Sequence, residues 1–228
     1  MKVADVPPND VQILIADDPE LLHRIYQLRY VVSVGELKKN VPSANHIKNI
    51  IFDEEIDNHC STIICGLTPT GDLVASLRLT WGEFGTPTGY HEQFLLDKFS
   101  EFSNNHFSFS SRLIINPQWR DGSLLLRLFT YAYRLVRQKG CYFNFLNCRP
   151  GSISKLYESF GFRQYGETYL DSHLGPQVRL VLVTEDIQHL SKISSVLEPI
   201  AHTMVNSPKF STVFQRLFPT TVNINEET

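Results

Sequence analysis

Hydrophobic residues recur at three- and four-residue steps through residues 123–139, and this spacing predicts one long amphipathic helix. Arginines lie on the opposite face, and Gly140 ends the pattern, as glycine often does at a helix C-terminus. Short runs rich in β-forming residues flank the helix at Phe107–Ile115 and Cys141–Asn147. The three elements therefore predict a β-α-β unit, in which the two strands lie side by side and parallel with a right-handed crossover.

Similar patterns predict the elements on either side of this unit. The predicted strands are Val11–Ile15, Cys60–Leu67, Leu73–Thr80, Arg163–Leu170 and Gln177–Val183. The predicted helices run from Asp18-Pro19 to Val32, over Ser152–Phe160, and through Ile187–Val205, where Pro199 should kink or break the helix. The turn residues of Thr68–Asp72 make a hairpin of the second and third strands. Residues 82–105 are expected to be irregular apart from a short helix at Phe94–Leu96.

The 228 residues suit one main domain with short extensions. We expect a flexible N-terminus at 1–10, the main domain at 11–185, a helical extension at 186–220 that packs on it, and a disordered tail at 221–228. The net charge of −3 lacks the basic field of a general nucleic-acid binder. No apolar run is long enough to cross a bilayer, and the N-terminus does not resemble a secretory signal.

The four cysteines, Cys60, Cys65, Cys141 and Cys148, show no close pairing motif. We therefore expect reduced thiols and a cytoplasmic protein. A zinc site built from His59, Cys60 and Cys65 is a minor alternative, and the leading expectation is that no metal is bound.

The stretch Ile51–Asp57 carries four carboxylates within five positions, namely Asp53, Glu54, Glu55 and Asp57. This pattern fits either a solvated acidic turn or a set of partners for buried cations. Arg78 and Arg112 each lie in a predicted central strand, and side-chain alternation puts Arg112 on the same face as Ser108 and Ser110. Because an unpaired buried charge is very costly, each of these arginines needs a carboxylate. The acidic stretch is the best source of that partner.

The loop Asn116–Gly122 joins the central strand to the long helix, so its free backbone N–H groups lie at the positive helix end. Such a loop suits a phosphate or a polarised carbonyl. Its sequence Pro117-Gln-Trp-Arg-Asp-Gly122, followed later by Leu156-Tyr157 and Gly161-Phe162, resembles the acyl-CoA-dependent N-acyltransferases of the GNAT superfamily. The resemblance implies the GNAT fold. This is an α/β (α+β) architecture in which helices flank a central mixed, mostly antiparallel twisted sheet with splayed fourth and fifth strands.

A second resemblance is more specific and spans residues 10–185. The acyl-homoserine-lactone synthases and the related long-chain N-acyl amino acid synthases have a similar order of charged residues, here Arg29 on the first helix, the Asp53–Asp57 cluster, Arg78, and Ser111-Arg112. The chain departs from the lactone synthases at Phe109, where they have glutamate, and at Ser33, where it lacks their aromatic residue and tryptophan. These departures favour the N-acyl amino acid synthase branch over a lactone synthase that uses S-adenosylmethionine.

The resemblance implies transfer of a fatty acyl group from a thioester to the amine of an amino acid, or to a lysine or ornithine side chain of a peptide. The donor would be acyl carrier protein or CoA, with acyl-phosphopantetheine as co-substrate and no permanently bound cofactor. Carrier protein is favoured, because Leu124 replaces the family's second small residue and Asp121 adds negative charge. Arg120, Arg127 and Arg134 would then meet the acidic carrier, unless they are simply a solvated helix face. A lactone synthase, or a non-catalytic module that binds an acyl carrier or peptide, is the alternative.

The resemblance also implies roles for single residues. Catalysis is assigned to Tyr157 as the acid for the leaving thiolate, to Glu55, Asp57 or Glu54 as the base, and to Ser111. The residues expected to bind the acyl donor, partly through backbone N–H groups that polarise its carbonyl, are Leu113, Ile114, Ile115, Arg120, Gly122, Ser123 and Asn147. The expected electrostatic cluster comprises Arg29, Asp53, Glu54, Arg78 and Arg112. Further candidates are His173 and Arg179 for acceptor recognition, and Phe143, Phe145 and Leu146 for an acyl tunnel or simply the core.

Overall fold

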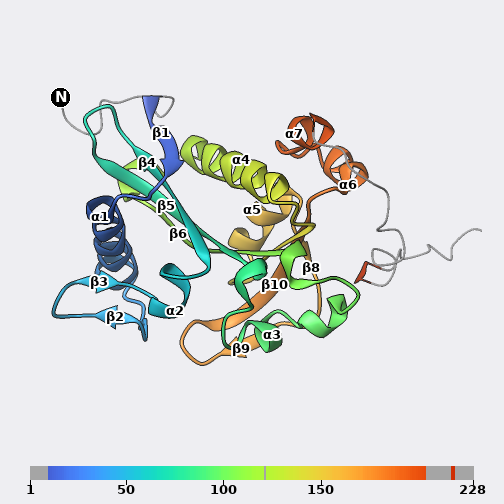
Figure 1. Ribbon diagram of the computed structural model, residues 1–228, viewed down its shortest axis with the longest axis horizontal. Coiled ribbons are helices and arrows are strands. Elements are labelled where there is room, and N and C mark those ends of the chain that lie inside the picture. The colour runs from blue at the N-terminus through green and yellow to red at the C-terminus, as the bar shows by residue number, and fades with distance from the viewer. Residues whose placement is uncertain (1–9, 121, 204–216, 219–228) are drawn as a thin grey trace, which may run out of the picture.

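A computed structural model describes residues 10–120, 122–203 and 217–218 of the protein, and one sheet organises them (Figure 1). The strands are β1 (Gln12–Ile15), β2 (Ala44–Asn45), β3 (Ile50–Ile51), β4 (Ser61–Leu67), β5 (Leu73–Trp81), β6 (Phe107–Ile115), β7 (Phe143–Cys148), β8 (Arg163–Gln164), β9 (Tyr169–Asp171) and β10 (Gly175–Val183). The helices are α1 (Pro19–Tyr30), α2 (Glu54–Asp57), α3 (Tyr90–Gln93), α4 (Ser123–Gln138), α5 (Ser152–Phe160), α6 (Ile187–Lys192) and α7 (Glu198–Thr203).

The main sheet has the strand order β1-β4-β5-β6-β7-β10-β8, and β9 pairs with β10. Every neighbouring pair is antiparallel except β6 and β7, which are parallel and joined by α4. The predicted β-α-β unit is therefore confirmed. Pairing of β6 with β7 covers only Phe107–Phe109 against Phe143–Phe145, although both strands continue beyond it. The two strands thus separate toward their C-terminal ends, which confirms the expected mixed, mostly antiparallel sheet with a splayed pair.

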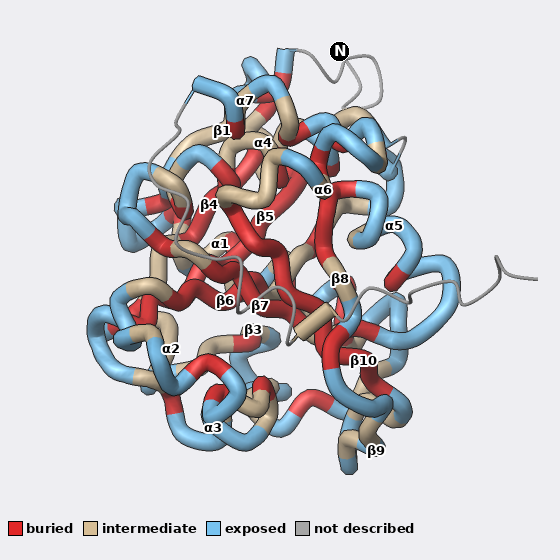
Figure 2. The backbone as a smooth tube through the Cα atoms, turned by 90° about the vertical axis from the view of Figure 1, so that its right-hand side faces the viewer, coloured by how far each residue is buried: buried red, intermediate tan, exposed pale blue. Residues whose placement is uncertain are grey.

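Helices cover both faces of the sheet (Figure 1). Two stripes of α4 pack on two parts of the sheet: Leu124 and Leu128 join the core over β5, while Leu125 and Phe129 join the core over β10. Helices α5, α6 and α7 complete the second of these cores. On the opposite face, α1 packs on β4, and the segment containing α3 packs on an aromatic core from β6, β7 and β10. Figure 2 shows that the buried backbone follows the central strands.

The observed boundaries differ from the predicted ones at a few places. The strand expected at Cys141–Asn147 begins two residues later, at Phe143. The strand expected at Arg163–Leu170 is divided into β8 and β9, both of which pair with β10. The first helix continues past Tyr30 as a π-helical segment, Val31–Glu36. Helix α5 has the predicted bounds, and Gly151 occupies its N-cap position.

The break expected at Pro199 lies earlier in the chain. Helix α6 ends at Lys192, and Ser194 adopts a positive φ of 54° between α6 and α7. Pro199 is the second residue of α7, where a missing N–H costs no helical hydrogen bond. Leu190 and Leu197 are buried in the core beneath α4 and α5. The expected tail at 221–228, residues 204–216 and 219–220 of the expected extension, and all but Asp10 of the expected flexible N-terminus lie outside the described residues.

A bulge interrupts the pairing of β5 with β6. Ser111 lies opposite Arg78 and Ile114 lies opposite Ser76, so Arg112 and Leu113 together face the single residue between them on β5. Arg112 adopts a positive φ of 52°, which is rare for a side chain of its size. The extra residue shifts the alternation of side chains by one. The prediction that Arg112 shares a face with the serines before it is therefore wrong.

No helix in the described ranges is both long and apolar enough to cross a membrane.

Candidate active site

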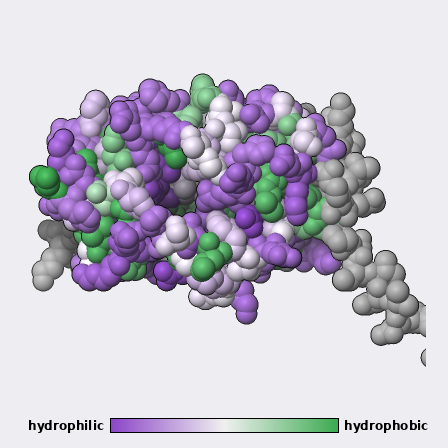
Figure 3. Space-filling model, turned by 90° about the horizontal axis from the view of Figure 1, so that it is seen from below, coloured by the Kyte–Doolittle hydropathy of each residue, from purple (hydrophilic) through white to green (hydrophobic). Residues whose placement is uncertain are grey.

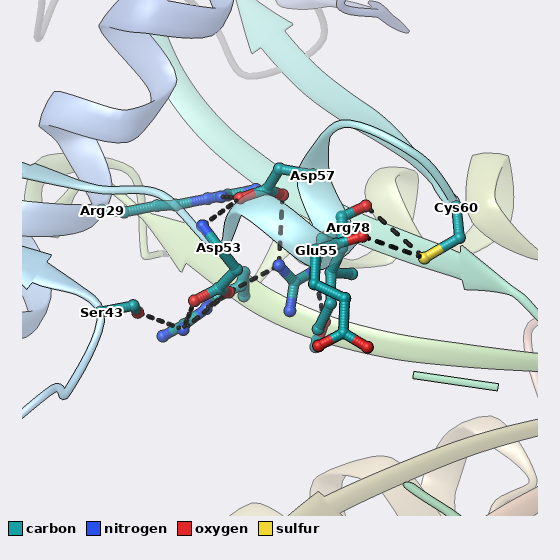
Figure 4. A network of polar contacts seen from close by, with 10 residues as sticks. Arg29, Ser43, Asp53, Glu55, Asp57, Cys60 and Arg78 are labelled. Atoms are coloured by element: carbon teal, nitrogen blue, oxygen red, sulfur yellow. Dashed lines mark hydrogen bonds and ion pairs between the residues drawn. The ribbon is translucent and has the colours of Figure 1, made fainter. Parts of the chain in front are cut away.

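Two aspartates at the ends of α2 hold three arginines in one buried network (Figure 4). Arg29 Nη1 donates to Asp57 Oδ2 at 2.8 Å, and Arg78 Nη1 donates to Asp57 Oδ1 at 3.2 Å. Asp53 and Asp57 are four residues apart, so the short helix presents both carboxylates on one side. Asp53 and Asp57 of the acidic stretch are therefore partners of buried cations, as the sequence predicted.

Asp53 joins the two strand arginines. It accepts from Arg78 Nη1 at 2.6 Å and from Arg112 Nη2 at 2.8 Å, and Arg112 Nη2 also donates to Ser43 at 3.1 Å. Arg112 reaches Asp53 because the bulge turns it to the α1 face of the sheet. Burial alone would raise the pKa of Asp53, but the charges of Arg112 and then Arg78 outweigh burial and hold the pKa well below its usual range.

At its Arg29 end the network is closed to solvent. The Arg29 side chain is 0% exposed, and burial lowers its pKa against the opposing pull of Asp57. Its Nε and Nη2 atoms have no hydrogen-bond partner among the described residues. Arg78 is better satisfied, since its Nε donates to Ser111 Oγ at 3.0 Å. Ser111, expected to be catalytic, therefore holds Arg78 across the β5–β6 ladder.

The two glutamates of the acidic stretch lie outside this network, which corrects the expectation for Glu54. Both are exposed on α2, and Figure 4 shows the Glu55 carboxylate pointing away from Asp57. Glu55 accepts hydrogen bonds from the backbone N–H and the hydroxyl of Thr88, at 2.9 and 3.0 Å. These two bonds lower the pKa of Glu55. Glu55 thereby ties α2 to the segment that leads into α3.

The separation of β6 from β7 leaves backbone groups of β6 without a strand partner on that side. Asn116 N donates to Val74 O on β5 at 2.9 Å. Because N–H groups alternate between the two neighbours of a strand, those of Leu113 and Ile115 face the β7 side. The side chains of both residues pack against the cores on either side of the gap. Ile114 is buried, and its N–H faces β5.

Tyr157 lies on α5 beside this gap. It packs against the same core as Leu113 and Ile115, with its ring 5.5 Å from Phe129 and 5.9 Å from Phe162. Burial first, and the neighbouring Cys148 second, raise the pKa of the Tyr157 phenol well above its usual value. The phenol therefore keeps its proton at neutral pH and can donate a hydrogen bond.

Asn147 lies on the β7 side of the gap. Its side-chain amide donates to the Tyr169 hydroxyl at 2.8 Å, and Tyr169 stacks 4.0 Å from the Arg179 guanidinium. Arg179 is buried and also donates to the backbone oxygens of Gln93 and Glu167. It therefore has a structural role here, whereas His173 is exposed in the β9–β10 turn. Phe143, Phe145 and Leu146 are fully packed in the core.

The loop between β6 and α4 holds its arginine in a salt bridge. Arg120 donates to both carboxylate oxygens of Glu36, at 2.5 and 2.8 Å, and its Nε donates to Ile115 O at 2.9 Å. Gly122 adopts a φ of 95° as the N-cap of α4, and no atom lies near a Cβ placed there. Ser123 follows as the first residue of the helix and is half-buried.

The three arginines expected to form a carrier-binding patch do not share one free surface. Arg120 is bound to Glu36, and Arg127 donates to the backbone oxygen of Val11 beside β1. Arg134 is exposed, and none of the interactions described above involves it. The helix spacing predicted that Arg127 and Arg134 share one face of α4, but it could not show that Arg127 is bound by the residue before β1.

No group of three potential metal ligands occurs in the part of the chain that the structure describes. Cys60 and Cys65 are buried free thiols, and Cys60 Sγ donates to backbone oxygens of α2. Burial raises the pKa of both thiols. The zinc alternative therefore has no support in this geometry.

Sequence reasoning missed residues of the segment that follows α1. Glu36 binds Arg120 and Ser43 binds Arg112, so both ends of this segment are tied to β6 and its loop. Lys39 lies between them. No motif or periodicity marks these residues, because their contacts depend on a long loop crossing the sheet.

The sequence and the fold of the chain are similar to those of known proteins. The family model described as N-acyl amino acid synthase FeeM matches residues 20–184. The solved structure of FeeM from uncultured soil microbes is similar with a TM-score of 0.63 at 11% identity, covering 83% of this chain and 97% of that one. The lactone synthase LasI gives a TM-score of 0.60 at 16% identity, covering 87% and 98%. A putative N-acetyltransferase from Lactobacillus plantarum gives 0.55 at 19%, covering 76% and 98%.

No curated protein matches the chain in sequence. The structural neighbours share its fold at low identity, whereas the family match extends over most of the chain, from α1 to the end of β10. This family match identifies the protein as an enzyme that transfers an acyl group to an amine. The chain belongs to the N-acyl amino acid synthase FeeM family.

Proposed function

We propose that the protein transfers a fatty acyl group from the thioester of acyl carrier protein to the amine of an amino acid. The observation that carries the proposal is the gap between β6 and β7, toward which the N–H groups of Leu113 and Ile115 face, with Tyr157 beside it. A thioester carbonyl in this gap would have hydrogen-bond donors where its oxygen becomes negative, and a phenol near its sulfur.

The reaction needs only these groups and a free amine. The amine nitrogen attacks the thioester carbon, the N–C bond forms, and negative charge develops on the oxygen near Leu113 and Ile115. The C–S bond then breaks, and the nitrogen loses a proton to water. The Tyr157 hydroxyl donates a hydrogen bond to the departing sulfur, which takes up a proton from water, so that an amide and a free thiol result. Holding donor and amine in contact supplies much of the acceleration.

The acidic residues have positioning roles in this scheme. Asp57 is fully buried between Arg29 and Arg78, so its lone pairs are occupied. Glu55 is bound to Thr88 and its pKa is lowered, which makes it a weak base. We assign Asp53 and Asp57 to holding the strand arginines beside the bulge, and Glu55 to holding the α3 segment.

The donor is assigned from the loop before α4. Because Arg120 is bound to Glu36, the loop offers its backbone N–H groups and no free guanidinium to a phosphate. This suits the single phosphate of a carrier-bound phosphopantetheine better than the additional phosphates of CoA. Among the structural neighbours, BjaI is described as a CoA-dependent lactone synthase. CoA is therefore the competing donor in the test.

The test supplies dodecanoyl carrier protein or dodecanoyl-CoA, with the twenty amino acids, a lysine-containing peptide or S-adenosylmethionine, and detects products by mass spectrometry. We expect N-dodecanoyl amino acids, formed faster from the carrier protein. Tyr157→Phe should lower the rate by about 100-fold, the lower end of the usual effect of a proton donor. Tyr131→Phe on α4 is the matched control and should keep full activity. An acyl lactone, a peptide product alone, or no product would each overturn the proposal.

A further inference from the structure

Asn147 lies on the side of the β6–β7 gap that carries the arginine network. Along β7, Leu146 and Cys148 join the core under α4. Phe143 and Phe145 join the aromatic core on the opposite face of the sheet. Because side chains alternate along a strand, Asn147 faces the same way as the two phenylalanines. This face also carries α1, α3 and the network, whereas α4 and the loop before it lie on the other face.

A series of contacts across three strands holds the Asn147 side chain in one orientation. Its amide nitrogen donates to the Tyr169 hydroxyl at 2.8 Å. The Tyr169 ring lies 4.0 Å from the guanidinium of Arg179, which is the residue opposite Asn147 in the pairing of β7 with β10. Arg179 is itself fixed, since it donates to the backbone oxygens of Gln93 and Glu167 at 2.6 and 3.0 Å.

This orientation leaves one acceptor and one donor available at the gap. Asn147 is half-buried, and its Oδ1 accepts no hydrogen bond from the residues that the structure describes. The Tyr169 hydroxyl accepts from Asn147 and keeps its own proton to donate. An amide oxygen can hold an N–H group without taking its proton. Asn147 Oδ1 is therefore suited to a ligand that offers an N–H group.

Asn147 also lies close to the level of the gap at which the thioester would be attacked. The last paired residues of the two strands are Phe109 and Phe145, so Asn147 and Ser111 each lie two residues beyond this pair, on opposite sides of the gap. The bulge adds a residue to β6 without lengthening the strand in proportion. Leu113, whose N–H would face the thioester oxygen, therefore lies about 3.3 Å, one residue rise, further along the gap than Ser111.

We propose that Asn147 is a catalytic residue that holds the attacking amine, and that Tyr169 positions Asn147. This inference rests on the proposed acyl transfer. One N–H of the amine donates to Asn147 Oδ1, which leaves the nitrogen lone pair free to point across the gap at the thioester carbon. As the N–C bond forms, the nitrogen becomes positively charged, so this hydrogen bond strengthens in the transition state. The surplus proton then leaves to water, and Asn147 remains a neutral amide throughout.

The competing ligand for Asn147 is an amide N–H of the donor's phosphopantetheine arm. The loop that would hold its phosphate ends at Gly122, at the start of α4, on the face of the sheet opposite the network. The arm would therefore reach the gap from the α4 face, whereas Asn147 faces the network. Figure 3 shows the molecule from the side that carries α2, α3 and β9, whose mostly hydrophilic surface suits the approach of a polar amine.

The test compares variants in the acylation assay with dodecanoyl carrier protein and the twenty amino acids. Asn147→Leu should lower the rate by about 10- to 100-fold, the usual effect of losing a hydrogen bond to a charged group. Tyr169→Phe removes the hydroxyl but keeps the ring against Arg179, and should lower the rate by about fivefold. Asn147→Asp keeps an oxygen to which Tyr169 can donate, so it should be much more active than Asn147→Leu. Tyr131→Phe is again the matched control.

The double variant separates a positioning role from a purely structural one. If Tyr169 acts through Asn147, Tyr169→Phe should cause no further loss of rate in the Asn147→Leu background. Multiplying losses would overturn the role of Tyr169. A normal rate in Asn147→Leu, or equal losses in Asn147→Leu and Asn147→Asp, would overturn the role of Asn147.

Binding of the donor is measured separately, by calorimetry with dodecanoyl carrier protein in the absence of amino acids. The wild type and Asn147→Leu should bind it equally well, whereas weaker binding by Asn147→Leu would assign Asn147 to the phosphopantetheine arm and overturn the inference. Thermal unfolding checks that each variant folds. A wild type that makes no amide would refute the proposed function itself, while an active wild type with unaffected variants would refute this inference alone.

Discussion

Replacing Asp53 by asparagine tests whether the buried network stabilises the fold through its charges. Asp53 is the carboxylate shared by Arg78 and Arg112, with side chains 14%, 3% and 25% exposed. Removing one partner of a buried ion pair typically costs about 3–5 kcal/mol, and the partial exposure of Arg112 places this case near 3. A chain of this size loses about 2–4 °C per kcal/mol, so the melting temperature should fall by about 6–12 °C.

The matched control is Glu54→Gln. Glu54 is the next residue on α2 and is exposed, and exposed positions usually change stability by less than about 0.5 kcal/mol. Both variants remove one negative charge from the same turn, so a difference between them reports burial and pairing rather than net charge. Urea unfolding followed by circular dichroism measures the free energies.

The pH dependence of this difference provides the sharper test. The pKa of Asp53 is lowered in the folded state, because Arg112 and Arg78 outweigh the opposing effect of burial. A carboxylate of this kind stabilises the fold above its unfolded pKa of about 4 and loses that contribution as the pH falls toward its folded value. The gap between wild type and Asp53→Asn should be full at pH 7 and shrink below about pH 4. A gap that stays constant down to pH 3 would refute the electrostatic reasoning.

Two further outcomes are expected from packing and burial. Gly161→Ala places a Cβ 2.4 Å from Leu190 Cδ2 at a φ of 114°, so we expect the free energy of unfolding to fall by about 2 kcal/mol or more. Gly140 has a φ of 71° and no atom within 4 Å of a Cβ placed there, so Gly140→Ala should cost only the backbone strain of about 1–2 kcal/mol. Burial raises the pKa of Cys65 to about 11, of Cys141 to about 12 and of Cys148 to about 11. A thiol reagent at pH 8 should therefore label these residues only after the protein is unfolded. Rapid labelling of the native protein would contradict their burial.

Much of the fold follows from local patterns in the sequence. The three- and four-residue steps of α4, the turn residues between β4 and β5, and the flanking strand signals all gave the observed elements. The pairing of Arg78 and Arg112 with the acidic stretch also followed, because a buried charge requires a partner. The choice among the four carboxylates did not, since it depends on which residues of a four-residue helix face the sheet.

The alternation of side chains along a strand could not predict the bulge at Arg112 and Leu113. It depends on a positive φ at Arg112, a residue type with no preference for that conformation, and it is held by bonds to Asp53 and Ser43 from distant parts of the chain. The salt bridge of Arg120 with Glu36 is equally non-local, joining residues 84 positions apart. The sequence therefore identified the residue types of the site, but it could not predict their geometry where a loop crosses the sheet.

The charge balance of the network is uneven between its buried and its exposed end. Three arginines share two aspartates, so the network carries one uncompensated positive charge. Arg29 and Arg78 are almost fully buried, whereas Arg112 is 25% exposed, so the excess charge lies nearest the surface at Arg112. Asp53 holds the Arg112 guanidinium through both of its carboxylate oxygens, so Asp53→Asn should loosen the bulge as well as lower the stability of the fold.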